Sequence, residues 1–316
     1  MRGILCRQHI YSIQYAYYAG NATPKWVRFS MTDTSFLPRP HHLLCSPSIK
    51  EPPLTRELNQ RIKALQGDPD FMTSLARGLL VLSVFTYHTR TVTMSQVSLE
   101  TGISRAAVRR VLYTLVRLGY VGEQGRAYML LPRVLAIGNA YAASSPMTLA
   151  AQPVLEALSN QLQASCSLSV LDGDEVLYIA RAETVRITSI CLKPGSRLPA
   201  YCTSMGRMLL AGLPQHTLEA YLNRTLLRPR TEHTITQRSE LVKRLLHISR
   251  EGTAVVDQEW EIGLRSIAVP VHNRRGEIVA ALNASTQVER VSLQCLQGPV
   301  LTALRDAAKH LSTLLE

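Results

Sequence analysis

The chain has 316 residues, enough for two domains with separate hydrophobic cores, and it carries a net charge of +12. Residues 72–140 hold eight Arg against two Glu while residues 141–316 are almost neutral, which predicts a polyanion-binding surface in the first segment only. No apolar run is long enough to cross a membrane, and the six cysteines form no CxxC pair or zinc-type cluster, so we expect a cytoplasmic protein without a metal site or cofactor.

Residues 1–67 differ from the rest of the chain and are predicted to form a disordered leader. Four tyrosines crowd the first 18 residues, and a proline-rich stretch follows. Met31 opens a more ordinary polar stretch, MTDTSFLPRP. We therefore hypothesise that translation starts at Met31 and that residues 1–30 are not translated.

Residues 68–131 are predicted to form a winged helix-turn-helix domain. Its first helix lies within FMTSLARGLLVLSVFTYH, where apolar residues recur at helical spacing. The apolar residues of this helical stripe are Leu75, Leu79, Leu82 and Phe85.

The order of elements between 92 and 131 is that of a helix, a tight turn, a second helix and a wing. A short helix over about 94–101 follows Thr93, a good N-cap residue, and Gly102 breaks it. Ser104 then caps a second helix that runs to about Leu118. YVGEQGRAYML closes the segment as two short apolar runs around a glycine-containing turn, which predicts a β-hairpin wing.

The second of these helices is predicted to recognise DNA. Val108, Val111, Leu112 and Leu115 recur at helical spacing and should face the core, which leaves a basic face on the other side. Arginine suits such a face because its planar fork pairs with guanine and with phosphate. The alternative is an amphipathic helix with a solvated basic face. The residues expected to contact double-stranded DNA are Ser95, Gln96, Ser104, Arg105, Ala106, Arg109, Arg110 and Tyr113, with Arg126 on the wing.

Residues 132–145 are predicted to form a linker helix, and residues 146–316 a second domain. In that domain CSLSVLDGDEVLYIARA and GLRSIAVPVHNRRGEIVAALNAST each predict two strands joined by a turn, with helical segments between and around them. The expected fold class is therefore α+β with a mostly antiparallel sheet.

One loop in the second domain is suited to bind a carboxylate. RLPAYCTSMGRMLLAGL runs from a loop into a helix that begins near Thr203 and Ser204, where free backbone N–H groups favour an anion. Ser204 serving only as a helix cap is the alternative. The motifs GxSxG, HExxH, GxxxxGK[ST] and GxGxxG are all missing from the sequence, and we do not expect an enzyme.

Four stretches of this chain resemble the IclR-type bacterial transcription regulators: GDPDFMTSLARGL, SRAAVRR, RLPAYCTSMGR and GLRSIAVP. The resemblance covers about residues 68–316 and is greatest to the Pca/Pob subgroup, which regulates aromatic-acid catabolism through protocatechuate and the β-ketoadipate pathway. It implies a GAF-like C-terminal domain with a six-stranded sheet and an effector cavity, in residues 146–316. It also implies a homodimer or homotetramer that binds a palindromic operator.

The resemblance also implies which residues line the effector cavity. They lie at the loop-helix junction, on the strand after the GLR motif, on the last strand and in the acidic stretch before GLR. By position these residues are Ser204, Met205, Leu264, Ser266, Asn283, Ser285 and Asp257, and Arg197 is a further candidate. Two interpretations of Arg197 and Arg265 stay open: they pair with an effector carboxylate, or they are structural partners of Asp257 or Glu259.

These observations predict a transcriptional regulator of aromatic-acid catabolism controlled by a small effector, either an aromatic acid or a ring-cleavage dicarboxylate. The alternative is a constitutive DNA-binding protein whose C-terminal domain only oligomerises. The sequence leaves open whether the protein activates or represses, and RNA polymerase would be a partner of an activator.

Overall fold

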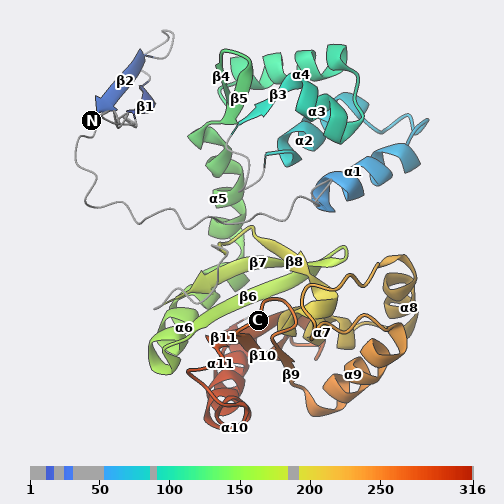
Figure 1. Ribbon diagram of the computed structural model, residues 1–316, viewed down its shortest axis with the longest axis vertical. Helices are drawn as coiled ribbons and strands as arrows, with labels where there is room; N and C mark the ends of the chain where they lie inside the picture. The colour runs from blue at the N-terminus through green and yellow to red at the C-terminus, as the bar shows by residue number, and fades with distance from the viewer. Residues whose placement is uncertain (1–11, 18–24, 31–52, 86–90, 184–191, 315–316) are drawn as a thin grey trace, which may run out of the picture. The chain divides into compact units, whose positions relative to one another are not determined.

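The computed structural model describes residues 12–17, 25–30, 53–85, 91–183 and 192–314 (Figure 1). In the predicted disordered leader, β1 (Ser12–Tyr17) and β2 (Lys25–Ser30) form an antiparallel pair, and α1 (Pro53–Ala64) is helical. The prediction of disorder is therefore wrong for these three segments. Met31, the hypothetical start of translation, lies outside the described residues.

The DNA-binding part contains helices α2 (Thr73–Ser83), α3 (Met94–Thr101) and α4 (Arg105–Arg117). A small antiparallel sheet joins β3 (Val92–Thr93), β5 (Ala127–Leu130) and β4 (Val121–Gln124) in that order. The predicted helix-turn-helix and wing are thus confirmed. Their shared core includes Val97, Val108, Leu112 and Val121.

Helix α1 also belongs to this part of the molecule, although the sequence places it in the leader. Leu58 and Ile62 pack against the core of the DNA-binding part, and the buried Thr55 hydroxyl hydrogen-bonds the Ser83 hydroxyl at 3.1 Å. The packed unit therefore begins before residue 68, the predicted domain boundary.

The predicted first helix is present as α2, but the apolar stripe named from the sequence is only partly its buried face. Leu75 and Leu79 are 59% and 52% exposed, whereas Leu80, Val81 and Val84 are fully buried. Apolar residues occupy most positions of this helix, so helical spacing fits more than one stripe. Packing against α1, α3 and α4 decides which stripe is buried.

Local hydrogen bonds fix the two helices of the motif. The Thr93 hydroxyl accepts from the Gln96 backbone N–H, and the Gln96 side chain accepts from the Thr93 N–H at 2.8 Å, which together form a capping box. Gly102 ends α3 with a φ of 68°, a left-handed conformation that favours glycine. The Ser104 hydroxyl then caps α4 by accepting from the Ala107 N–H.

The predicted linker is helical in the structure. The 3-10 turn η1 (Pro132–Val134) leads into α5 (Leu135–Ser144), which has no buried residue, and α6 (Pro146–Leu162) follows after Ser145. The Ser145 hydroxyl caps α6 by accepting from the Thr148 N–H.

The C-terminal part is built on one six-stranded sheet in which every neighbouring pair is antiparallel, as predicted. The order across the sheet is β8-β7-β6-β11-β10-β9. The strands are β6 (Ser165–Asp172), β7 (Glu175–Ala182), β8 (Arg197–Pro199), β9 (Ala254–Asp257), β10 (Leu264–His272) and β11 (Ile278–Gln287).

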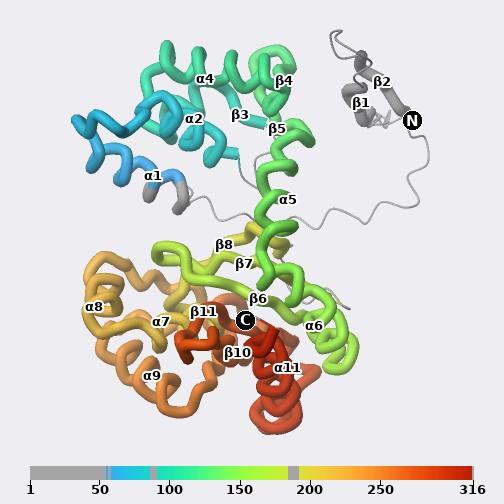
Figure 2. The backbone as a smooth tube through the Cα atoms, turned by 180° about the vertical axis from the view of Figure 1, so that it is seen from behind, coloured from blue at the N-terminus to red at the C-terminus, as the bar shows by residue number. Residues whose placement is uncertain are grey.

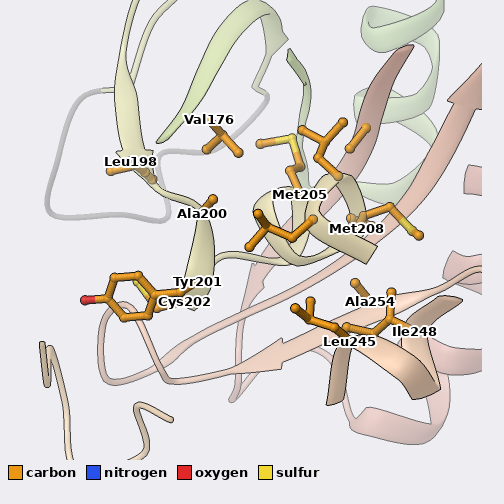
Figure 3. Packing of buried hydrophobic residues seen from close by; sticks show 14 of the residues in the cluster. Val176, Leu198, Ala200, Tyr201, Cys202, Met205, Met208, Leu245, Ile248 and Ala254 are labelled. Carbon is orange, nitrogen blue, oxygen red and sulfur yellow. The ribbon is translucent and has the colours of Figure 1, made fainter. Parts of the chain in front are cut away.

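Helices cover both faces of this sheet (Figures 1 and 2). Helix α6 and α11 (Leu301–Leu314) pack on one face, and α10 (Leu293–Cys295) with the π-helical turn η3 (Leu296–Val300) precedes α11. On the other face lies α7 (Ser204–Ala211), preceded by the turn η2 (Ala200–Cys202), with α8 (Gln215–Arg224) and α9 (Arg238–Glu251) in the same cluster. Figure 3 shows Met205 of α7 on the side of Val176, and Leu245 and Ile248 of α9 beside Ala254, all in one apolar cluster.

The side of strand β6 that faces α7 is polar. Cys166 and Leu168 belong to the apolar cluster under α6 and α11, so the alternating residues Ser165, Ser167 and Ser169 face the other way. All three serines are fully buried, and the Ser169 hydroxyl donates to the Met205 sulfur at 3.1 Å. The α7 face of the sheet therefore carries buried hydroxyl groups beside apolar side chains.

Candidate functional site

The exposed face of α4 and the tip of the wing form the candidate DNA-binding surface. Every residue predicted to contact DNA is exposed, while Val108, Leu112 and Leu115 on the other side of α4 are buried, as predicted. Among the described residues, no acidic side chain pairs with Arg105, Arg109 or Arg110. Three guanidinium groups are thus available to bases or phosphates.

Some side chains on this surface also have local roles. The Gln96 carboxamide oxygen is occupied by Thr93, and the Ser104 hydroxyl caps α4, so both residues position the motif. Arg117 lies 5.8 Å from the ring centre of Tyr113, which orients that exposed ring. In the wing, the Tyr128 hydroxyl donates to Glu123 at 3.1 Å.

A cavity lies between α7 and the polar face of the sheet. Its enclosed space is about 30 Å³, which is room for about two water molecules. An aromatic acid therefore fits only if lining side chains move, and a flexible methionine is suited to that. The cavity is lined by Tyr178, Arg181, Leu192, Leu198, Cys202, Thr203, Ser204, Met205, Val256, Trp260, Leu264, Ser266, Asn283 and Ser285.

Helix α7 begins at this cavity. Thr203 caps the helix by accepting from the Gly206 N–H at 3.3 Å, so Ser204 is the first helical residue and is not the cap. The capping alternative for Ser204 is therefore wrong. A side chain at Gly206 would overlap the backbone of Ala200, which explains why the loop and the helix can lie so close. The positive end of the helix dipole is turned toward the cavity wall.

Three strands place polar side chains in one row beside α7. Arg181 on β7, Ser167 on β6 and Asn283 on β11 are direct cross-strand partners. The Arg181 Nη1 donates to the Ser167 hydroxyl at 2.9 Å, and the Asn283 amide donates to the Ser285 hydroxyl at 2.9 Å. Two buried atoms in this row have no hydrogen-bond partner among the described residues, the Arg181 Nε and the Asn283 Oδ1. Each costs about 1–3 kcal/mol while it lacks a partner.

The Cys202 thiol and the Tyr178 hydroxyl of the cavity wall are neutral near pH 7, whereas the Arg181 guanidinium is charged. Burial raises the pKa of the Cys202 thiol to about 12, and burial raises the pKa of the Tyr178 hydroxyl to about 12 although Arg181 is near. A thiol with such a pKa is a poor nucleophile. The arrangement therefore suits binding of a small anion.

Six of the predicted effector residues line this cavity: Ser204, Met205, Leu264, Ser266, Asn283 and Ser285. Arg197 and Asp257 do not, and both predictions are corrected by the ion pairs these residues form. Arg197 binds Asp172 at 2.6 Å and Glu175 at 2.9 Å, while Asp257 accepts two hydrogen bonds from Arg265, each 2.9 Å long. The charged groups of Arg197 and Asp257 are thus held in ion pairs within the sheet domain.

The sequence did not identify Arg181, Trp260 or Ser167 as site residues. Alternation of serine with Cys166 and Leu168 was the available signal for β6, because serine recurring on a strand buried on both faces marks a polar wall. Trp260 follows Glu259, which binds the fully buried Arg207: the Nη1–Oε1 distance is 2.6 Å, and Nη2 pairs with Oε2. This ion pair joins α7 to the segment that carries Trp260.

Comparison with known proteins identifies the family of the DNA-binding part and of the C-terminal part. The IclR helix-turn-helix domain model matches residues 74–125, and the model of the C-terminal domain of the bacterial transcriptional regulator IclR matches residues 139–313. The chain belongs to the IclR family. Its two matched parts are the DNA-binding part and the sheet domain that holds the cavity.

Two relatives place this IclR-type regulator close to those of aromatic catabolism. The Pca regulon regulatory protein of Pseudomonas putida is 48% identical over 82% of this chain and 90% of that protein. The p-hydroxybenzoate hydroxylase transcriptional activator of Acinetobacter baylyi is 35% identical over 78% of this chain and 93% of that protein. A solved IclR homologue from Microbacterium hydrocarbonoxydans in complex with 4-hydroxybenzoate is 25% identical, with a TM-score of 0.66 over 77% of this chain and 98% of that one.

The family models and the relatives described here are those of transcription regulators. Within the described ranges, no helix is long and apolar enough to span a membrane. The same residues contain no group of three or more His, Cys, Asp or Glu placed to hold a metal ion.

Proposed function

We propose that this IclR-type protein regulates genes of aromatic-acid catabolism in the protocatechuate and β-ketoadipate pathway, under control of a small carboxylate effector. The observation that carries this proposal is the cavity beside α7, which combines apolar walls with a buried guanidinium and hydroxyl groups. Such a cavity suits an acid with an apolar body. The relatives that regulate the Pca regulon and p-hydroxybenzoate hydroxylase support the pathway.

We infer that α4 lies in the major groove of double-stranded DNA. Arg105, Ala106, Arg109, Arg110 and Tyr113 would contact bases or phosphates, and Arg126 would reach the backbone or the minor groove from the wing. Ser95, Gln96 and Ser104 would contact DNA at the helix N-termini. A homodimer or homotetramer would bind the two halves of a palindromic operator.

The effector would act by binding one arrangement of the DNA-binding domains better than another. It can shift their equilibrium only by that difference in affinity. An activator would also contact RNA polymerase. The protein would act in the cytoplasm as a regulator without catalytic activity.

A calorimetric titration of the full chain tests the proposal. The ligands are β-ketoadipate, protocatechuate and 4-hydroxybenzoate, each added also to a footprinting assay on the DNA upstream of the gene. Saturable binding of one acid that changes DNA affinity or the footprint supports an effector-controlled switch. Binding of none, with DNA binding retained, favours instead a constitutive DNA-binding protein whose C-terminal domain only oligomerises.

A further inference from the structure

Strand β7 carries a buried arginine that contacts the cavity. The Arg181 side chain is 5% exposed, its Nη1 donates to Ser167 at 2.9 Å and its Nη2 donates to Glu183 at 3.0 Å. The remaining donor, Nε, is buried and has no partner among the residues that the structure describes. A guanidinium remains charged at any ordinary pH, so the domain buries a cation with one donor unused.

No other Lys, Arg, Asp or Glu lines the cavity among the described residues. The partner of Arg181, Glu183, is 38% exposed and lies outside the cavity lining, so solvent screens the attraction between the two. The Arg181 guanidinium has only a serine hydroxyl and a screened carboxylate as partners, so it can still bind a second anion. A ligand carboxylate in the cavity would accept a hydrogen bond from the Nε and would lie beside the rest of the guanidinium.

We propose that Arg181 binds the effector carboxylate and that Glu183 competes with the effector for the same guanidinium. The assignment rests on the proposed effector control. The binding residue Arg181 lies on β7, apart from the N-terminus of α7, and the competing carboxylate of Glu183 lies outside the cavity lining. Arg197, two strands from β6 on the same sheet, cannot take this role, because Asp172 and Glu175 occupy its guanidinium.

The test compares an acid with its uncharged amide in the full chain. Protocatechuate and 4-hydroxybenzoate are titrated beside their primary amides into wild type, Arg181→Gln, Arg181→Lys, Glu183→Gln and Arg197→Gln. Calorimetry gives the affinity. In a Trp26→Phe chain the fluorescence of Trp260, which lines the cavity, gives a second readout, because these are the two tryptophans of the sequence. Operator binding and the unfolding midpoint of each variant report folding.

Wild type and the matched control Arg197→Gln should bind the acid more tightly than the amide. Arg181→Gln should weaken acid binding by about 30-fold or more, since it removes one partner of a buried charge pair, and should change amide binding little. Arg181→Lys should give an intermediate loss, because an ammonium keeps the charge and lacks the fork. Glu183→Gln, on an exposed side chain, should tighten acid binding about 2- to 5-fold.

The outcomes separate the assignment from the function on which it rests. An acid that binds wild type and Arg181→Gln equally well overturns the role of Arg181 and leaves effector control standing. Loss of acid and amide binding together in Arg181→Gln, with the unfolding midpoint lowered, also overturns it and assigns Arg181 a structural role. Unchanged or weaker acid binding by Glu183→Gln overturns the competition. Binding of no acid by wild type overturns the proposed effector control and the assignment with it.

Discussion

Replacing Arg207 by methionine should destabilise the C-terminal domain by about 3–5 kcal/mol, because the change leaves a buried carboxylate without its counter-ion. Arg207 is 0% exposed and the Glu259 side chain 9% exposed. The substitution removes both hydrogen bonds to Glu259 and the 2.7 Å bond from Nε to the Tyr201 carbonyl. The Ile235 N–H, 3.0 Å from Glu259, remains as a donor to the carboxylate but does not neutralise it.

Chemical and thermal unfolding of the full chain measure this loss. With Trp26 replaced by phenylalanine, the fluorescence of Trp260 reports on the C-terminal domain alone. For a domain of this size the expected fall in the midpoint is about 6–20 °C. Arg224→Met is the matched control: Arg224 also pairs with a carboxylate, Asp174 at 2.7 Å, but it is 51% exposed, so its loss should cost less than about 1 kcal/mol.

The double variant Arg207→Met/Glu259→Gln decides whether charge is the cause. Removal of both charges should recover most of the lost stability, because the glutamine oxygen can still accept from Ile235. A loss below about 1 kcal/mol in Arg207→Met, or a double variant as unstable as the sum of both single variants, refutes the reasoning. Since the pair joins α7 to the segment of Trp260, Arg207→Met should also weaken effector binding.

Four further changes test other parts of the molecule. Arg109→Ala should cost about 1–3 kcal/mol of operator binding and relax the preference at one base pair if Arg109 reads a guanine; equal weakening on all DNA sequences would show a phosphate contact. Ser204→Leu should abolish the effector response and leave operator binding intact, and an unchanged response removes Ser204 from the site. Gly206→Ala should destabilise the domain by about 1–3 kcal/mol or more, because the new methyl group would overlap the Ala200 backbone; an unchanged unfolding midpoint contradicts this. At neutral pH iodoacetamide should modify the exposed Cys295 and spare Cys202, whose pKa is about 12 through burial, and peptide mass mapping that finds Cys202 alkylated first would count against a closed cavity.

The local features of this protein follow from the sequence. The capping box at Thr93, the left-handed Gly102 and the cap at Ser104 depend on contacts within a few residues, so side-chain type and spacing suffice to predict them. The strand pairs on either side of the DGDE and NRRG turns were predictable for the same reason. The face of α4 was also predictable, because polar and apolar residues separate cleanly around that helix.

Features that depend on distant contacts required the tertiary structure. The stripe of α2 that is buried depends on packing against α1, α3 and α4, and the sequence of a helix with apolar residues at most positions does not mark it. The partners of four arginines were also undetermined, because many carboxylates are available and only the tertiary packing brings particular pairs together. Strand order pairs Arg197 with Asp172 and Glu175 and Arg265 with Asp257, and it leaves Arg181 with an unused donor beside the cavity. The packing of α7 against the segment after β9 pairs Arg207 with Glu259. Sequence patterns identified the family and predicted the loop and helix that line the cavity, but cross-strand register decided which charged side chain keeps an unused donor there.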